Sequence, residues 1–255
     1  MKAFTRRAAL YAVSVLALAA CGGADGGETT KTAGTPDSAA VAEMSMGADD
    51  APVTIVEYAS WTCPACLQYQ NDVVGKLKAD YVETGKVKFI FREFPTPPAN
   101  ISVAGFAIAR CAGEDRYFEV LDELFARQTA ILSLAREGGQ VKAALQQVAA
   151  NHGITDEAEF DACLQNSDIR KAIAASVAQG EADGVNGTPT VLMNGTVLPG
   201  YEWRRWEGMQ AVLNEALGED APAATPAEMT PAEDSSPESI DIDSDESISS
   251  DSSSE

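Results

Sequence analysis

The order of strand-like and helix-like segments limits what this chain can fold into. Residues 52–59 (PVTIVEYA) form an apolar, β-branched run that fits a buried strand, and residues 86–94 alternate into a second strand. Between them, residues 64–82 carry apolar side chains at helical spacing, and a connecting helix lets the two strands lie parallel. We therefore predict a β-α-β unit at the start of the domain.

A long stretch with almost only helical periodicity follows, from residue 99 to about residue 182. Glycines and an Asn-Ser pair divide this stretch into separate candidate helices. The candidates are residues 101–112, 116–134, 140–151, 156–164 and 168–181. The pattern predicts an all-helical insertion at residues 99–183.

Strand patterns return only after this insertion. Residues 190–193 and 196–198 flank an Asn194-Gly195 turn, which is typical of a hairpin. An amphipathic helix at residues 203–217 ends the domain. The predicted fold class is α/β, with one unit built from residues 46–98 and 184–218 and interrupted by the helical insertion.

The amino terminus has the layout of a bacterial export signal, predicted at residues 1–20. Basic residues at 2–7 precede an apolar run that is too short to remain as a membrane span. The sequence LAAC at 18–21 resembles the lipobox of bacterial lipoproteins, which implies cleavage before Cys21 and its acylation. The alternative is plain cleavage after the ALA motif at 17–19. We expect a lipid-anchored protein on the periplasmic side of a bacterial membrane.

Low-complexity segments flank the domain. Residues 21–45 combine the lipidated cysteine with a Gly-, Thr- and Ala-rich stretch that predicts a flexible tether. Residues 219–255 predict a disordered acidic tail, which carries 12 acidic and no basic residues of a chain with net charge −21. Residues 21–218 still hold 27 acidic against 15 basic residues, so we expect no nucleic-acid partner.

The number of cysteines agrees with an exported protein. Five are present, and assigning Cys21 to lipid leaves Cys63, Cys66, Cys111 and Cys163 as two possible pairs. An oxidising environment allows disulfides. We expect Cys111 and Cys163, on separate predicted helices, to form a structural disulfide; the alternative is two unlinked buried thiols.

Three interpretations compete for the sequence CPAC at residues 63–66. A structural zinc site needs four ligands, yet the chain has no second C-x-x-C and its only histidine is His152. A passive disulfide gains stability with loop length, and this loop is very short. The position between a strand and a helix favours redox chemistry, because backbone N–H groups and the helix dipole stabilise a thiolate at Cys63. Cys66, one turn on, is placed to resolve a mixed disulfide.

Together these segments resemble a known family. The sequences VTIVEYASWTCPAC at 53–66, FREFP at 91–95 and GVNGTPT at 184–190 are similar to those of DsbA-like members of the thioredoxin superfamily. The resemblance covers about residues 46–217. It implies a thioredoxin fold with an inserted all-helical domain, and neither a metal nor an organic cofactor.

The resemblance also assigns roles to single residues. Pro189 matches a proline that the family holds cis beside the active site, where Thr188 and Pro189 would present backbone groups to a substrate strand. Glu57 stands where the family has a buried acid that moves protons to and from the second cysteine; the alternative is a strand-end glutamate that reaches water. For Trp61, an exposed apolar contact surface for unfolded substrates and simple packing both stay open. DsbA itself has histidine where this chain has Ala65, so we expect a less depressed Cys63 pKa and a less oxidising couple.

We therefore expect an exported protein thiol–disulfide oxidoreductase with Cys63, Cys66 and Glu57 as catalytic residues. Oxidation of substrate thiols is the expected direction, with reduction and isomerisation left open. Its expected partners are cysteine-containing exported proteins, a redox protein that recycles the active site, and a membrane. The alternative is a thioredoxin-fold lipoprotein that binds a soft metal ion or a partner protein through the dithiol.

Overall fold

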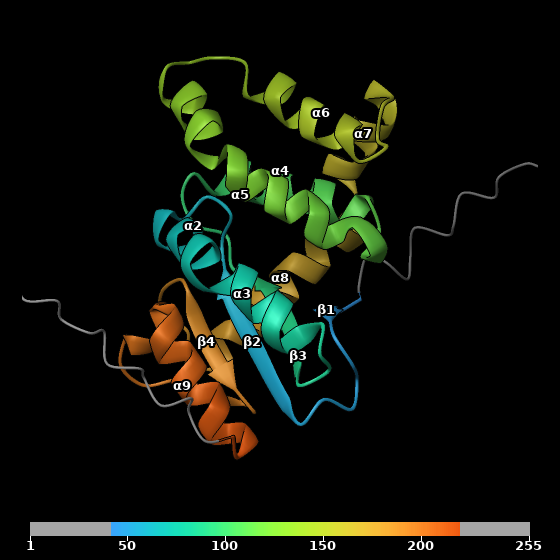
Figure 1. Cartoon of the computed structure of the whole chain (residues 1–255). Coiled ribbons are helices and arrows are strands. Elements are labelled where there is room, and N and C mark those ends of the chain that lie inside the picture. Colours follow the sequence, from blue (N-terminus) through green and yellow to red (C-terminus); the bar gives the residue numbers. More distant parts are fainter. Residues whose placement is uncertain (1–41, 220–255) are drawn as a thin grey trace, which may run out of the picture.

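The computed structural model describes residues 42–219 of the chain (Figure 1). The predicted export signal, the lipidation site Cys21, most of the tether and all but the first residue of the acidic tail lie outside the described residues. Within the described part, no helix combines the length and apolar character needed to cross a membrane.

A mixed five-stranded sheet forms the centre of the molecule, in the order β1-β3-β2-β4-β5. Its strands are β1 (Met44–Met46), β2 (Val53–Ala59), β3 (Val87–Glu93), β4 (Thr190–Met193) and β5 (Thr196–Val197). Strands β2 and β3 are parallel, as the β-α-β prediction requires. Strand β4 is antiparallel to both β2 and β5. Asn194 and Gly195 have φ angles of 49° and 80° in the tight turn of the predicted hairpin.

Strand β1 shows that the predicted boundary of the tether was wrong. Met44 and Ser45 were assigned to the flexible segment, but they pair antiparallel with the end of β3, where Met44 lies opposite Phe91. The Met44 side chain is only 2% exposed. A strand of three residues with one deeply buried side chain is too short to show a period of two in the sequence.

One long helix connects β2 to β3 and contains two π-helical segments. It runs through α2 (Pro64–Tyr69), η1 (Gln70–Val74), α3 (Gly75–Leu77) and η2 (Lys78–Val82). The predicted insertion consists of α4 (Ala99–Cys111), α5 (Glu114–Arg136), α6 (Val141–Asn151), α7 (Glu157–Gln165) and α8 (Ser167–Ala182). Helices α4 to α7 gather beyond one end of the sheet, at the top of Figure 1, and α8 returns behind it.

The last predicted helix is interrupted near its start. Residues Glu202–Arg204 form the 3-10 turn η3, and α9 begins only at Trp206 and ends at Leu217. Arg205 between them has an extended backbone, with φ −116° and ψ 151°. The apolar spacing of Trp203 and Trp206 suits one continuous helix, so the pattern alone did not reveal this break.

The two faces of the sheet pack against different helices. Ile55 and Ala59 on β2 join the main core, to which α2 and α9 also contribute. Val56 and Tyr58 point to the other face, where Gly180 of α8 lies directly against Tyr58. Glu57 alternates with Val56 and Tyr58, and it therefore faces the main core on the side of α2.

A disulfide between Cys111 and Cys163 joins α4 to α7, with the two Cα atoms 5.7 Å apart. It closes a loop over a sequence separation of 52 residues. In the chain-entropy model such a loop restricts the unfolded chain enough to stabilise the fold by about 4 kcal/mol.

Candidate redox site

The two remaining cysteines lie at the amino-terminal end of α2. Cys63 is the N-cap residue, with an extended backbone, and Pro64 occupies the first helical position, where a missing N–H group leaves no bond unmade. Both Cys63 and Cys66 are free thiols, so the structure shows the dithiol form. Cys63 is half-buried, whereas Cys66 is fully buried one turn further on.

The Thr188-Pro189 peptide bond is cis and the loop that contains it contacts Cys63. When it is protonated, the Cys63 thiol donates to the carbonyl oxygen of Thr188, which lies 3.5 Å from Sγ. Arg204 Nη2 donates to the carbonyl oxygen of Pro189 at 3.2 Å, and its guanidinium group lies 5.1 Å from the centre of the Trp203 ring. The loop is thereby also held by a side chain of η3.

The two thiols have opposite pKa shifts. A hydrogen bond from the Cys66 thiol lowers the pKa of Cys63, with further help from the Thr188 side chain and two backbone N–H groups, to about 5 despite the opposing effect of burial. Burial raises the pKa of Cys66, and its hydrogen bond to Cys63 adds to this rise. Near neutral pH Cys63 is a thiolate that can attack or leave, while Cys66 keeps its proton.

Glu57 lies behind the cysteines with a side chain that is 0% exposed, so it does not reach water as the alternative interpretation required. Among residues 42–219, neither of its carboxylate oxygens has a hydrogen-bond partner. Burial raises the pKa of Glu57 to about 8, against the lowering effect of Lys78. Lys78 itself bonds to Asp122 at 2.9 Å. A carboxyl group that titrates near neutral pH is suited to both donate and accept a proton.

The sequence over residues 39–215 matches the thioredoxin family model. The chain belongs to the thioredoxin family. A helical insertion separates its β-α-β unit from its hairpin, as in the fold of solved DsbA structures, and the predicted fold class is confirmed.

Relatives and solved structures agree with this assignment. The chain is 26% identical over 178 residues to a Rickettsia bellii protein named provisionally as a protein-disulfide oxidoreductase, covering 69% of this chain and 65% of that protein. It is 28% identical over 168 residues to the Bacillus cereus "Probable disulfide bond formation protein D", and the match covers 61% of this chain and 71% of that protein. The structure of Wolbachia pipientis alpha-DsbA1 superposes with a TM-score of 0.60 at 22% identity, and the match covers 69% of this chain and 91% of that one. The chain thus spans slightly less than two thirds of the Rickettsia bellii relative.

Trp61 is not part of an exposed contact surface in this thioredoxin-family site. Its side chain is 0% exposed, and its Nε1 atom donates to the carbonyl oxygen of Ser102 at 2.8 Å. A Cβ atom at Gly105 of α4 would collide with the indole ring. Trp61 therefore packs the insertion against the site, which excludes the exposed contact surface and leaves the packing interpretation.

Gln128 on α5 is a site residue that sequence reasoning missed. Its side-chain Nε2 atom donates to the carbonyl oxygens of Trp61 at 2.7 Å and Cys63 at 3.0 Å. It is only 2% exposed and lies within the buried stripe that includes Leu124 and Ile131. The sequence did contain a signal for this role, because Gln128 occupies an apolar position of the helical pattern. A polar side chain buried there needs a hydrogen-bond partner.

A buried hydroxyl network fixes the turn before Cys63. The Ser60 Oγ atom lies 2.9 Å from Thr62 Oγ1 and 2.8 Å from Ser102 Oγ, and Thr62 Oγ1 lies 3.0 Å from Thr96 Oγ1. These bonds tie the turn to the loop after β3 and to α4. The sequence contained no signal for this network, because short hydroxyl side chains do not form a pattern that predicts such hydrogen bonds.

An open groove of about 620 Å³ lies beside the C-P-A-C turn. Thr62 and Pro64 form one side of it, next to Cys63, and Ile101 and Leu132 contribute apolar surface from α4 and α5. Its lining is mostly apolar and includes the charged side chain of Arg136. The groove therefore lies within reach of any polypeptide that brings a cysteine to Cys63.

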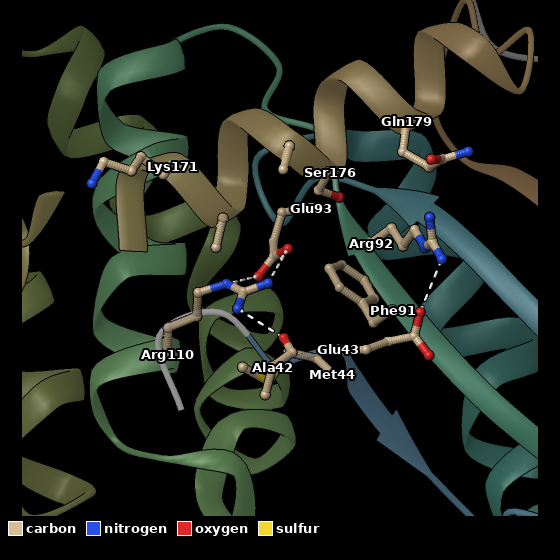
Figure 2. Close-up of a pocket in the computed structure, with 12 residues that line it drawn as sticks. Ala42, Glu43, Met44, Phe91, Arg92, Glu93, Arg110, Lys171, Ser176 and Gln179 are labelled. Atoms are coloured by element: carbon tan, nitrogen blue, oxygen red, sulfur yellow. Dashed lines mark hydrogen bonds and ion pairs between the residues drawn. The ribbon is translucent and has the colours of Figure 1, made fainter. Parts of the chain in front are cut away.

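A second pocket of about 420 Å³ lies at the β1 edge of the sheet, against α8 (Figure 2). Two ion pairs are among the groups that line it. Arg110 bonds Glu93 through Nε at 2.6 Å and Nη2 at 2.9 Å, and Arg92 bonds Glu43 at 2.9 Å. No cysteine lines this pocket. The Arg110–Glu93 pair holds β3 to α4 of the insertion, the Arg92–Glu43 pair holds β3 to the residue before β1, and neither supplies a reactive thiol.

Residues 42–219 contain no group of three or more histidine, cysteine, aspartate or glutamate side chains arranged to hold a metal ion. Cys63 and Cys66 thus have no third ligand of these types within the described chain.

Proposed function

We propose that this chain is an exported thiol–disulfide oxidoreductase that oxidises cysteine-containing proteins. The observation that carries the proposal is the unequal pair of thiols. Cys63 is accessible, has a pKa of about 5 and contacts the cis-proline loop, whereas Cys66 is buried behind it with a raised pKa. The names of the Rickettsia and Bacillus relatives point to the same class of reaction.

The reaction starts from the Cys63–Cys66 disulfide. A substrate thiolate attacks Cys63 Sγ, a substrate–Cys63 disulfide forms, and Cys66 leaves and takes up a proton. A second substrate thiolate then attacks the substrate sulfur of this mixed disulfide. The substrate disulfide forms, Cys63 leaves as a thiolate, and the enzyme becomes a dithiol. Two electrons have moved from the substrate to the enzyme.

The lowered pKa of Cys63 supports the oxidising direction. A thiolate that is stabilised in the dithiol form makes reduction of the enzyme more favourable, and such an enzyme is a stronger oxidant. The shift arises chiefly from the hydrogen bond of Cys66 and from Thr188, without a histidine between the cysteines. We therefore propose a couple that is oxidising but less so than that of DsbA.

Substrates would bind as extended segments at two places next to Cys63. The backbone of Thr188 and Pro189 is available to pair with a substrate strand. The mostly apolar groove along Pro64 and Leu132 would receive the residues that flank the substrate cysteine. Export, a lipid anchor at Cys21 and a redox partner that reoxidises the dithiol complete the proposal.

The test is the oxidation of reduced, unfolded ribonuclease by the oxidised full-length chain. We expect faster disulfide formation than with Cys63→Ser, which removes the attacked sulfur. The Cys66→Ser variant should accumulate a mixed disulfide on a non-reducing gel. The proposal is wrong if ribonuclease is oxidised no faster by the wild type than by Cys63→Ser. Stoichiometric copper(I) retention by the reduced wild type, lost in Cys63→Ser, would instead favour the metal-binding alternative.

A further inference from the structure

Three buried oxygen atoms behind the cysteines have no hydrogen-bond partner among residues 42–219. They are both carboxylate oxygens of Glu57 and the hydroxyl oxygen of Tyr69. The two side chains are 0% and 1% exposed. Because nearly all buried polar groups in proteins are hydrogen-bonded, two such groups in one part of a core need a common explanation.

These groups lie in the same layer of the core. Glu57 points from β2 toward α2, and Cys66 and Tyr69 are three residues apart on the buried side of α2. The charge of Glu57 acts on both of them. Burial is the main cause of the raised pKa of the Tyr69 hydroxyl and of the raised pKa of the Cys66 thiol, and the charge of Glu57 raises both further. The unpartnered acceptors of Glu57 and the unpartnered hydroxyl of Tyr69 thus lie on the same side of the sheet as Cys66, close enough for the charge of Glu57 to act on both Tyr69 and Cys66.

The position of the Tyr69 ring is fixed from its other side. The ring packs edge-on against Trp203, with the ring centres 5.5 Å apart. Trp203 is itself held by a bond from its Nε1 atom to the carbonyl oxygen of Gly200 at 3.1 Å. The ring cannot swing its hydroxyl to the surface without breaking this packing.

We propose that Tyr69 is a positioning residue for Glu57: its hydroxyl donates to the carboxylate through one bridging water and holds it for proton exchange with Cys66. This inference rests on the proposed function. When Cys66 leaves from the disulfide, its sulfur takes the proton of the Glu57 carboxyl group. When Cys66 attacks a mixed disulfide, the thiol proton returns to the carboxylate, the Cys63–Cys66 bond forms and the substrate leaves as a thiolate.

The sign of the expected effect follows from the donor. A hydroxyl group that donates to a carboxylate stabilises its charged form, so Tyr69→Phe should raise the Glu57 pKa above its value of about 8. A charge-assisted hydrogen bond in a core corresponds to about one pH unit. The other titratable groups coupled to Glu57 keep their identity in this variant. They are Cys63, Cys66, Lys78, Tyr117 and Asp122.

The experiment is a titration of the Glu57 carboxyl carbon by ¹³C NMR in the reduced full-length chain. We expect the midpoint to rise by about one pH unit in Tyr69→Phe. Tyr81→Phe is the matched control, because the Tyr81 side chain is also buried but its hydroxyl donates to Asn214 at 2.6 Å. The Glu57 midpoint in this variant should equal that of the wild type. An unchanged midpoint in folded Tyr69→Phe overturns the proposal.

A second measurement needs no change at Tyr69. The ¹³Cζ resonance of Tyr69 in the wild type should move with the midpoint of Glu57, and this movement should vanish in Glu57→Gln. A Tyr69 resonance that is indifferent to the Glu57 titration overturns the proposal even if Tyr69→Phe does not fold. Since neither titration requires enzymatic turnover, a failure of the proposed function would appear separately, as absent oxidation of ribonuclease.

Discussion

Replacing Glu57 by glutamine should change how the stability of the protein depends on pH. The folded chain holds this carboxyl group at a pKa of about 8, against 4.5 for the ordinary group, and the main cause is burial. Between these values the folded state binds the proton more tightly than the unfolded chain does. The stability from the protonated carboxyl is therefore fully present below pH 4.5 and is lost as the pH rises through 8.

The magnitude follows from the size of the shift. Each pKa unit corresponds to about 1.36 kcal/mol, so the wild type should lose about 4 kcal/mol of unfolding free energy between pH 4.5 and pH 8 through this group. Glutamine has a similar shape and no charge to desolvate. The difference in unfolding free energy between Glu57→Gln and the wild type should therefore grow by about this amount over that range.

The assay is urea unfolding at a series of pH values from 4.5 to 9. Both proteins should carry Cys63→Ser and Cys66→Ser, because the lowered Cys63 pKa gives a pH dependence of the opposite sign; burial, the main cause of the raised Glu57 pKa, is retained in this background. The stability from the Cys63 thiolate is lost as the pH falls through 5, and the serine background removes it. A difference between the two proteins that stays constant with pH would refute the reasoning.

Three further outcomes are expected. The rate at which iodoacetamide alkylates Cys63 in the reduced chain should rise with a midpoint near pH 5, and a midpoint near that of an ordinary thiol would contradict the hydrogen-bonded thiolate. Arg110→Met should lower the unfolding free energy by about 3–5 kcal/mol, because it leaves a buried glutamate unpaired. Arg92→Met breaks a more exposed pair and should cost about 1 kcal/mol or less, so equal losses would count against this argument. Replacing both Cys111 and Cys163 by serine should cost about 4 kcal/mol, and an unchanged urea midpoint would show that the bond does not restrict the unfolded chain.

The sequence predicted the main elements because their side chains repeat over long segments. The strand ending at Ala59 and the helical insertion have periods that extend over several residues or turns, and the structure has them within a few residues of the predicted positions. Strand β1 and the break at Arg205 are shorter than one such repeat, and the sequence did not reveal them. The pattern shows which face of an element is apolar, but the exact ends depend on local backbone conformation.

The candidate site was predictable only where residues are close in sequence or belong to a familiar motif. Cys63 and Cys66 could be named from their spacing, and Pro189 and Glu57 from the family resemblance. The exposure of Trp61 could not be judged, because it depends on α4 packing against the turn from more than 40 positions away. The role of Gln128 likewise depends on a distant helix.

The opposite behaviour of the two thiols follows from this combination of local and distant structure. The turn before α2 leaves Cys63 at the helix end, half-exposed, and the helix then directs Cys66 into the core. Helix propensity alone would leave both sulfurs near the same positive dipole end. The hydrogen bond between the two thiols and the burial of Cys66 create most of the difference, and the Thr188 side chain on the cis-proline loop lowers the pKa of Cys63 further. A C-P-A-C turn that left Cys66 exposed, or that lacked the Thr188 side chain beside Cys63, would therefore lack part of the pKa difference on which the proposed oxidation depends.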